Sequence, residues 1–310
     1  MSVKLNTAAK LIAKTSVIGI LTLNIVGYIS AYMLTHYNTS NPFGWGIARS
    51  YNYNSPQDFK LQYSNQKIVI NKQEWLDSWL ITSPADESRG IVILFHGKDS
   101  NKSSLLTSAK IFHTLNYDTL LVDFRGAGNS SGDVTTIGVK EAEDVAIAVD
   151  YVKKLQSDNP IILYGLSMGS AAILRAVARH NIQPDGIILE LPFVSLLDSV
   201  KTRLKSYSLP PSPMAELMVF WGGIQHGFNG FAHKPIEDAE VVQCPVLILA
   251  GESDRSIALD KVQRLFENFD SDKSLVIFPQ AGHELLARKN PQLWQQSVKN
   301  FIQNIDYLKQ

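Results

Sequence analysis

The stretch "ILYGLSMGSAA", residues 162–172, decides how the rest of the chain is interpreted. An apolar run leads into it, and the helix-forming sequence "SAAILRAVARH" overlaps its end. Ser167 has glycine two places to either side, at Gly165 and Gly169. A sharp turn from a strand into a helix raises a serine hydroxyl from the backbone, and bulky neighbours there would collide with both elements. The pattern therefore predicts a nucleophile on a strand-to-helix turn.

Short apolar runs alternate with amphipathic helices from residue 90 onward. Strands that are apolar on both faces are typical of a parallel sheet with helices on each side. The runs are "GIVILFHG", "DTLLVDFRG", "PIILYGLS", "DGIILELPF", "PVLILAGESD" and "SLVIFPQAGH". This alternation predicts a mostly parallel, doubly wound α/β fold. Upstream, "QKIVINK" and "EWLDSWLITS" predict an antiparallel hairpin at one edge of the sheet.

The N-terminal region differs from the rest of the chain. Residues 15–37 contain no Asp, Glu, Lys or Arg, and at ~1.5 Å per residue they can cross a hydrocarbon core of ~30 Å. We predict a retained transmembrane helix there, because the apolar region of a cleaved signal peptide is shorter. Three lysines precede it, and the first basic residue after it is Arg49. The positive-inside rule therefore predicts that residues 1–14 are cytoplasmic and that the remainder is extracytoplasmic.

Two further boundaries follow from composition. Residues 38–60 are rich in Asn, Ser, Tyr, Pro and Gly, which predicts a linker into a folded domain over residues 61–310. Within that domain, residues 193–243 interrupt the alternation and contain "SPMAELMVFWGGIQHGFNGF". We expect a small helical cap or one wall of a substrate pocket, and the alternative is a crossover helix with a long loop.

A serine nucleophile needs a base, and the base needs an orienting acid. Asp254 in "LAGESDRSI" and His283 in "FPQAGHELL" each follow an apolar run. The carboxyl ends of parallel strands meet at one edge of a sheet, so we expect both side chains near Ser167. Glu252 and Glu190 are the alternatives to Asp254.

Two backbone N–H groups are candidates for an oxyanion hole. The N–H of Met168 lies at the start of the predicted helix, beside the serine hydroxyl. The N–H of Lys98 follows His96 and Gly97 at the end of the first parallel run, where glycine allows close approach of the backbone. We expect the charged side chain of Lys98 to lie in solvent or at the pocket mouth, and His96 to be a structural hydrogen-bonding residue.

Together these residues resemble the α/β-hydrolase superfamily over about residues 60–308. The chain is most similar to membrane-associated members of the serine-aminopeptidase or lysophospholipase-like branch. The matching motifs are "HG", "DFRGAGNSSG", "GLSMG", "LELPF", "GESD" and "AGHE". The resemblance implies that Ser167, Asp254 and His283 form a catalytic triad. The N-terminal anchor is not part of the shared domain.

These observations predict a serine hydrolase that cleaves carboxylic esters through an acyl-enzyme, without metal or organic cofactor. The predicted anchor and the apolar insert favour lipid or long acyl esters. A peptidase or amidase with the same triad, or a catalytically silent membrane-tethered binding protein, are the alternatives. Lys and Arg total 29, as do Asp and Glu, so bulk charge does not favour nucleic acid as a partner. The lone Cys244 precedes an apolar run, and we expect it to be a packing residue.

Overall fold

The computed structural model describes residues 2–37, 55–85, 87–155 and 159–308 of the 310-residue chain. One eight-stranded sheet runs through the main body in the order β1-β2-β4-β3-β5-β6-β7-β8. The strands are β1 (Tyr63–Val69), β2 (Trp75–Ile81), β3 (Ile91–Phe95), β4 (Asp118–Val122), β5 (Ile161–Leu166), β6 (Gly186–Glu190), β7 (Val246–Gly251) and β8 (Lys273–Phe278).

The sheet confirms the predicted α/β architecture. All six apolar runs form parallel strands, and β1 and β2 form the predicted antiparallel hairpin at one edge. Every residue of β3 to β7 is buried, because helices cover both faces of these strands. The last strand, β8, is less buried than its apolar sequence predicts, because it lies at the opposite edge and has only one neighbouring strand.

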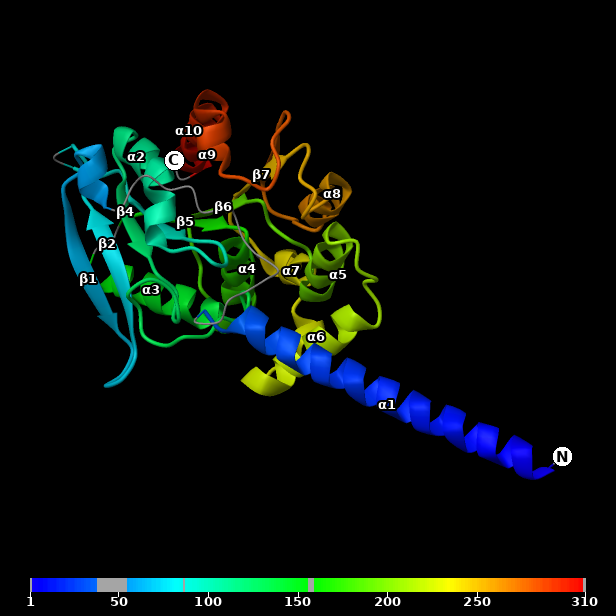
Figure 1. Cartoon of the computed structure of the whole chain (residues 1–310). Coiled ribbons are helices and arrows are strands. Elements are labelled where there is room, and N and C mark those ends of the chain that lie inside the picture. The colour runs from blue at the N-terminus through cyan, green and yellow to red at the C-terminus, as the bar shows by residue number, and fades with distance from the viewer. Residues whose placement is uncertain (1, 38–54, 86, 156–158, 309–310) are drawn as a thin grey trace.

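Two helical layers cover the sheet (Figure 1). One contains α2 (Leu106–Thr114), α9 (Leu286–Lys289) and α10 (Pro291–Leu308), and the other contains α3 (Glu141–Leu155), α4 (Met168–His180), α7 (Pro235–Asp238) and α8 (Leu259–Glu267). The amphipathic helices turn their apolar faces to the sheet. In α10, for example, Trp294, Val298 and Ile302 are buried against the sheet.

Residues between β6 and β7 form helices, which we call the cap. They are α5 (Leu196–Ser206), α6 (Met214–His226), η3 (Gly230–Ala232), α7 and η4 (Ala239–Val241). The sequence insert, residues 193–243, covers these elements. Short 3-10 helices also occur at η1 (Pro56–Phe59) and η2 (Lys102–Leu105). Most of the predicted linker, residues 38–54, lies outside the described residues.

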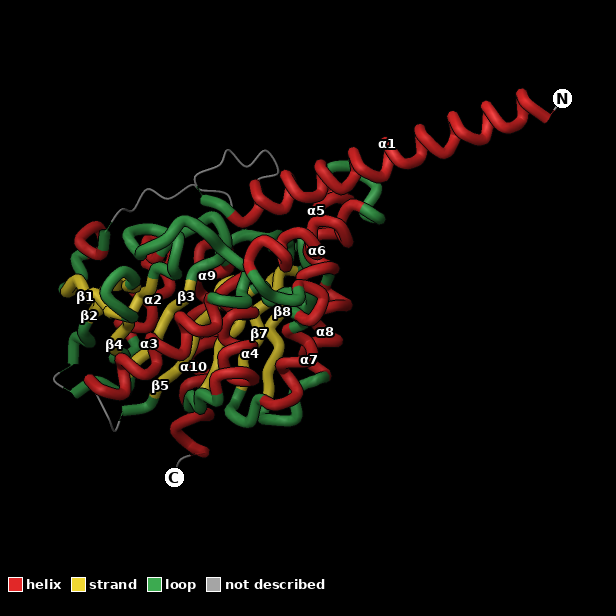
Figure 2. Tube along the Cα trace, turned by 90° about the horizontal axis from the view of Figure 1, so that it is seen from below, coloured by secondary structure: helices red, strands yellow, loops and turns green. Residues whose placement is uncertain are grey.

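Helix α1 (Ser2–Thr35) projects from the body as one continuous rod (Figures 1 and 2). Its segment Lys10–Thr35 contains an 18-residue window with a mean hydropathy of 1.8 and is long and apolar enough to cross a membrane. It begins earlier than the predicted transmembrane stretch, and its last turns pack on α6 of the cap. Past its end, Tyr37 donates its N–H to the carbonyl of Asp133 at 2.9 Å, so the main body holds this end of the rod.

Candidate active site

Ser167 lies on the corner between β5 and α4. Its backbone has φ 51° and ψ −105°, a left-handed conformation that is rare for a residue with a side chain. A Cβ at Gly165 would lie 2.5 Å from the backbone of Gly169, and a Cβ at Gly169 would lie 2.4 Å from the carbonyl oxygen of Phe95. Both positions therefore require glycine, because the helix crosses the strands too closely for a side chain.

The structure brings His283 and Asp254 to this corner from loops that follow β8 and β7. The Oγ of Ser167 lies 3.4 Å from Nε2 of His283, and Nδ1 of His283 lies 2.7 Å from Oδ2 of Asp254. The first distance is longer than a tight hydrogen bond, as is common at such a pair before substrate binds. Ser167, His283 and Asp254 thus form a continuous chain of contacts at one edge of the sheet.

Backbone groups hold the carboxylate of Asp254 in place. Its Oδ1 accepts the N–H of Ser256 at 2.7 Å and that of Ile257 at 3.0 Å, which leaves Oδ2 facing the imidazole. A carboxylate beside Nδ1 favours the tautomer that carries its proton there. Nε2 is then the acceptor that faces the serine hydroxyl.

Neither alternative carboxyl contacts the imidazole of His283 in the described structure. Glu252 accepts the N–H of Gln280 at 2.9 Å. Glu190 is fully buried, and its carboxyl accepts hydrogen bonds from Tyr164 Oη, Trp294 Nε1 and the N–H of Leu286 at 2.7–2.8 Å. Burial raises the pKa of Glu190, while these donors act in the opposite direction. Because Leu286 follows the histidine loop, Glu190 fixes that loop from beneath.

The two oxyanion candidates border the same cavity as Ser167. Met168 is the first residue of α4, and Lys98 follows β3. His96 is buried; its Nε2 accepts the N–H of Phe124 at 3.2 Å, so Nδ1 carries the proton and donates to the carbonyl of Gly97 at 2.7 Å. This bond fixes the backbone before Lys98. Burial lowers the pKa of His96, consistent with a neutral ring.

The expectation that the Lys98 side chain lies in solvent is wrong, whereas the residue does border the pocket. Its side chain is only 5% exposed and lines the pocket, where Nζ donates to Oδ1 of Asp99 at 2.7 Å. Burial lowers the pKa of the ammonium group, and the neighbouring carboxylate opposes that effect. The local sequence around Lys98 could not predict this burial. The cap lies over the loop after β3 only once the chain has folded.

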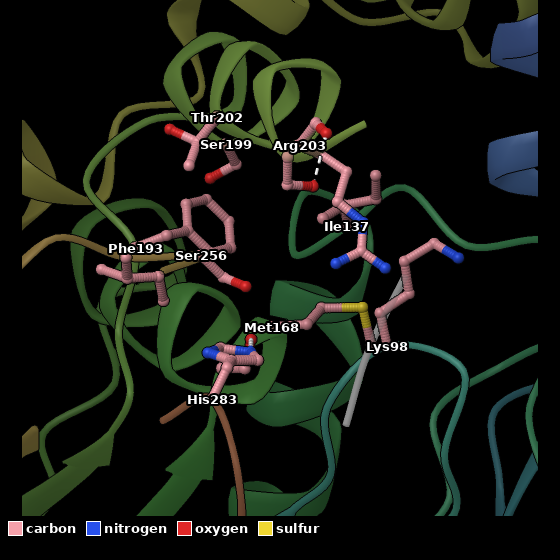
Figure 3. A pocket seen from close by; sticks show the side chains of 12 residues that line it. Lys98, Ile137, Met168, Phe193, Ser199, Thr202, Arg203, Ser256 and His283 are labelled. Carbon is pink, nitrogen blue, oxygen red and sulfur yellow. Dashed lines mark hydrogen bonds between the residues drawn. The ribbon is translucent and has the colours of Figure 1, made fainter. Parts of the chain in front are cut away.

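A pocket of about 590 Å³, part of it open to solvent, lies above Ser167 and His283 (Figure 3). Phe193 and Ile257 supply apolar walls, and the rest of the roof comes from α5. The guanidinium of Arg203 points from α5 into the cavity in Figure 3. The lining residues among those described include no Asp or Glu. The site is therefore a cleft with apolar walls and the Arg203 guanidinium on one side.

Sequence reasoning missed Ile137 as a pocket residue. This β-branched residue has φ 58°, and its carbonyl accepts a bond from Nε2 of His233 at 3.0 Å. Around it, Glu141 accepts the backbone N–H groups of Thr136 and Gly138, both at 2.9 Å. The hydrogen bonds of the buried Glu141 stabilise the strained backbone of Ile137. The local sequence "TTIGVK" contains no motif that predicts this conformation.

Cys244 and the potential metal ligands were also candidates for site residues. Cys244 is half-buried, and burial raises the pKa of its thiol to about 12, consistent with a packing role. No group of three His, Cys, Asp or Glu residues in the described part of the chain is placed to hold a metal ion.

Comparison with protein families gives two adjoining matches. The family described as "Serine aminopeptidase, S33" matches residues 86–221, and the "Dienelactone hydrolase family" matches residues 213–309. The first match contains the Ser167 corner, and the second contains Asp254 and His283. The two matches together extend over the sheet from before β3 to the last helix.

Curated relatives share about a quarter of their residues with this chain. "Uncharacterized protein YqkD" of Bacillus subtilis is 27% identical over 69% of this chain and 72% of its own length. "Protein bem46" of Schizosaccharomyces pombe is 26% identical over 84% of this chain and 83% of its own. "Lysophosphatidylserine lipase ABHD12" of Macaca fascicularis is 24% identical over 63% of this chain but only 48% of its own length.

Solved structures with the same fold include two esterase-type proteins. The Pyrococcus furiosus esterase Pf2001 superposes with a TM-score of 0.69, at 22% identity over 84% of this chain and 97% of that one. Est1E from Butyrivibrio proteoclasticus, with ferulic acid bound, gives a TM-score of 0.63 at 17% identity over 78% and 99%. The sheet, the glycine-flanked corner and the two family matches agree, and the chain belongs to the α/β-hydrolase superfamily.

Proposed function

We propose that this protein is a serine hydrolase that cleaves carboxylic esters through an acyl-enzyme. The observation that carries the proposal is the contact chain from Ser167 through His283 to Asp254, which ends at a carboxylate fixed by two backbone N–H groups. Such an arrangement is what a weak hydroxyl nucleophile needs in order to lose its proton as it attacks.

In the proposed mechanism, Oγ of Ser167 attacks the ester carbonyl and Nε2 of His283 takes its proton. Asp254 stabilises the imidazolium that forms. The N–H groups of Lys98 and Met168 hold the oxyanion, and one such donor is worth about 3 kcal/mol in the barrier. His283 then protonates the leaving alkoxide, and the same residue removes a proton from water as it hydrolyses the acyl-enzyme. This chemistry requires no metal or organic cofactor.

We further propose that the substrate is a lipid or another long acyl ester. Three observations support it: the apolar walls of the pocket, the apolar helix α1, and the similarity to proteins named lysophosphatidylserine lipase. We propose that α1 is a single-pass anchor with a cytoplasmic N-terminus and an extracytoplasmic hydrolase domain. The lysines before the apolar segment favour that orientation.

The match to the serine aminopeptidase family makes peptide hydrolysis the second candidate. A free N-terminal ammonium group needs a carboxylate partner in the site. The described lining residues include the guanidinium of Arg203 and no carboxylate, while the ammonium of Lys98 is paired with Asp99. The charge of the pocket therefore favours an ester over an aminoacyl substrate. Rates on a panel of esters and aminoacyl amides decide between them, and faster cleavage of the amides would overturn the preference.

The central test is Ser167→Ala in the full-length chain. We expect loss of ester turnover and of covalent labelling by a fluorophosphonate probe. The matched control is Ser199→Ala, which removes a pocket hydroxyl whose bond goes to the carbonyl of Ser195 at 3.0 Å. That variant should keep both activities. Unchanged turnover in Ser167→Ala would show that the nucleophile is another group, and absence of labelling in the native chain would favour a silent binding protein.

A further inference from the structure

A second cavity adjoins the candidate active site, and no motif in the sequence pointed to it. It has a volume of about 350 Å³, part of it open to solvent, and lies between α1 and the cap. Its apolar walls include Ala31 and Leu34 of α1, Met218 and Gly222 of α6, and Val200 of α5. We call it the α1–α6 cavity. Thr35 and Thr136 are its polar lining residues among those described.

Ile137 is a wall that the two cavities share, because it lines both of them. Its backbone is held in the left-handed region by the His233 and Glu141 hydrogen bonds described above. A β-branched residue adopts that conformation only when its surroundings impose it. The side chain in Figure 3 lies at the edge of the active-site pocket, beneath α5. The α1–α6 cavity is therefore a direct neighbour of the space above Ser167.

Small residues let α1 approach α6 closely. A Cβ at Gly27 would lie 2.8 Å from Cβ of Leu217, and a Cβ at Gly222 would meet Cβ of Ala31 at 3.9 Å. Gly27 and Ala31 are four residues apart, which is the spacing by which helices in membranes pack. Gln225 Nε2 also donates to the carbonyl of Tyr28 at 2.9 Å. The cap and the end of α1 thus form one packed unit.

In the anchored state proposed above, the packed unit of α1 and the cap would lie at the edge of the bilayer. Residues 10–23 are exposed, and burial against the cap begins at Gly27. The exposed part of α1 that carries no charged residue, residues 15–26, spans about 18 Å, so a hydrocarbon core of about 30 Å would also include the part of α1 that packs on the cap. Phe220 and Ile224 of α6 are 46% and 61% exposed, so the apolar surface continues from α1 onto the cap.

We propose that the α1–α6 cavity binds the acyl chain of a membrane-resident ester, so that α1 forms a wall of the substrate site. This inference rests on the proposed function and names the substrate class of the same site. An acyl chain fits the chemistry because the cavity is apolar, adjoins the pocket that contains Ser167, and borders a helix suited to lipid. The ester group then lies at Ser167, and its polar remainder lies beside Arg203.

The test narrows the cavity from opposite walls in the full-length chain. Ala31→Leu adds volume from α1, and Gly222→Leu adds volume from α6. The matched control is Ala13→Leu, at an exposed position of α1 outside the cavity. The substrates are p-nitrophenyl acetate, butyrate, dodecanoate and hexadecanoate in detergent micelles.

We expect both leucine variants of the cavity to lose at least about tenfold in kcat/KM on hexadecanoate, since each excluded methylene removes about 0.8 kcal/mol of burial. Turnover of acetate and butyrate should stay within about twofold, because the triad is untouched. The Ala13→Leu control should match the native chain on all four esters. The proposal is overturned if long and short esters change in parallel, or if neither variant changes the chain-length profile.

A second readout separates this proposal from the proposed function. A hexadecanoic acid that carries a photoreactive diazirine labels its binding site without turnover. We expect label on the peptide that contains residues 214–226, reduced in Ala31→Leu and retained in Ala13→Leu. Label that is equal in all variants would overturn the acyl site even if esters are cleaved. Loss of label in Ala31→Leu without ester cleavage by the native chain would overturn the function and keep the site.

Discussion

Two buried carboxyl groups lie near the imidazole of His283, and their hydrogen bonds assign them different roles. Asp254 bonds to Nδ1 directly, whereas Glu190 accepts three hydrogen bonds from elsewhere and fixes the loop after the histidine. The residue order in the sequence leaves both open as the orienting acid. The distances favour Asp254.

Replacing each carboxyl by its amide tests this assignment. In Asp254→Asn, the remaining oxygen stays with the N–H groups of Ser256 and Ile257, so the amide NH₂ faces Nδ1. That contact favours the wrong tautomer, with the proton on Nε2, and we expect kcat/KM for esters to fall about 10³–10⁴-fold. The unfolding midpoint should change little.

Glu190→Gln is the matched comparison. Its NH₂ must face at least one of the N–H donors, Trp294 Nε1 or the N–H of Leu286, so we expect a loss of about 1–3 kcal/mol in unfolding free energy. Ester turnover should remain within about tenfold of the native chain. If the activity losses of the two variants were reversed, Glu190 would be the orienting acid.

Much of the site could be predicted from sequence at this scale. Glycine spacing located Ser167, and the positions after apolar runs located Asp254 and His283, since parallel strands end at a common edge. Ile137 and the burial of Lys98 could not be predicted. The conformation of Ile137 depends on His233 of the cap and on Glu141. Lys98 borders a pocket roofed by α5 of the cap. Contacts between segments distant in the chain leave no local pattern.

At the scale of elements, the loop before α3 depends on the cap through His233. Burial lowers the pKa of His233 to about 4, and its neutral ring donates from Nε2 to the carbonyl of Ile137. The unfolded chain therefore binds more protons than the folded one between about pH 6.5 and pH 4. Stability is fully present above that range and decreases as the pH falls through it.

We expect this one residue to contribute a slope of about 1.4 kcal/mol per pH unit between about pH 6 and pH 4.5. His233→Gln keeps a side-chain donor for the carbonyl of Ile137 and does not titrate. Urea unfolding of both proteins at several pH values measures the difference. Parallel curves for the variant and the native chain would show that His233 is not the source.

The elements themselves followed from periodicity, apart from their ends. Alternating and fully apolar runs predicted the hairpin and the six parallel strands, because side-chain direction repeats every two residues in a strand. The exposure of β8 and the early start of α1 did not follow. Edge position is a property of the assembled sheet, and helices extend into flanking polar residues at no steric cost.

For the whole molecule, the proposed anchor makes a simple prediction. We expect alkaline carbonate to leave the full-length chain in the membrane fraction, because residues 15–23 of α1 are exposed and carry no charged side chain. A chain that begins at residue 38 lacks α1 and should be released by the same wash. Immunoblots of pellet and supernatant give the result. Release of the full-length chain would contradict the anchor.

The close contact of Gly27 with Leu217 should constrain how the sequences of α1 and the cap change during evolution. A generic tether is exchangeable: any apolar helix of similar length would serve. Here α1 and the cap pack closely on each other. A transmembrane helix taken from an unrelated single-pass protein would therefore leave a void or a steric clash at the positions of Gly27 and Ala31. Substitutions on the two sides of that contact are expected to be compensated in pairs as lineages diverge.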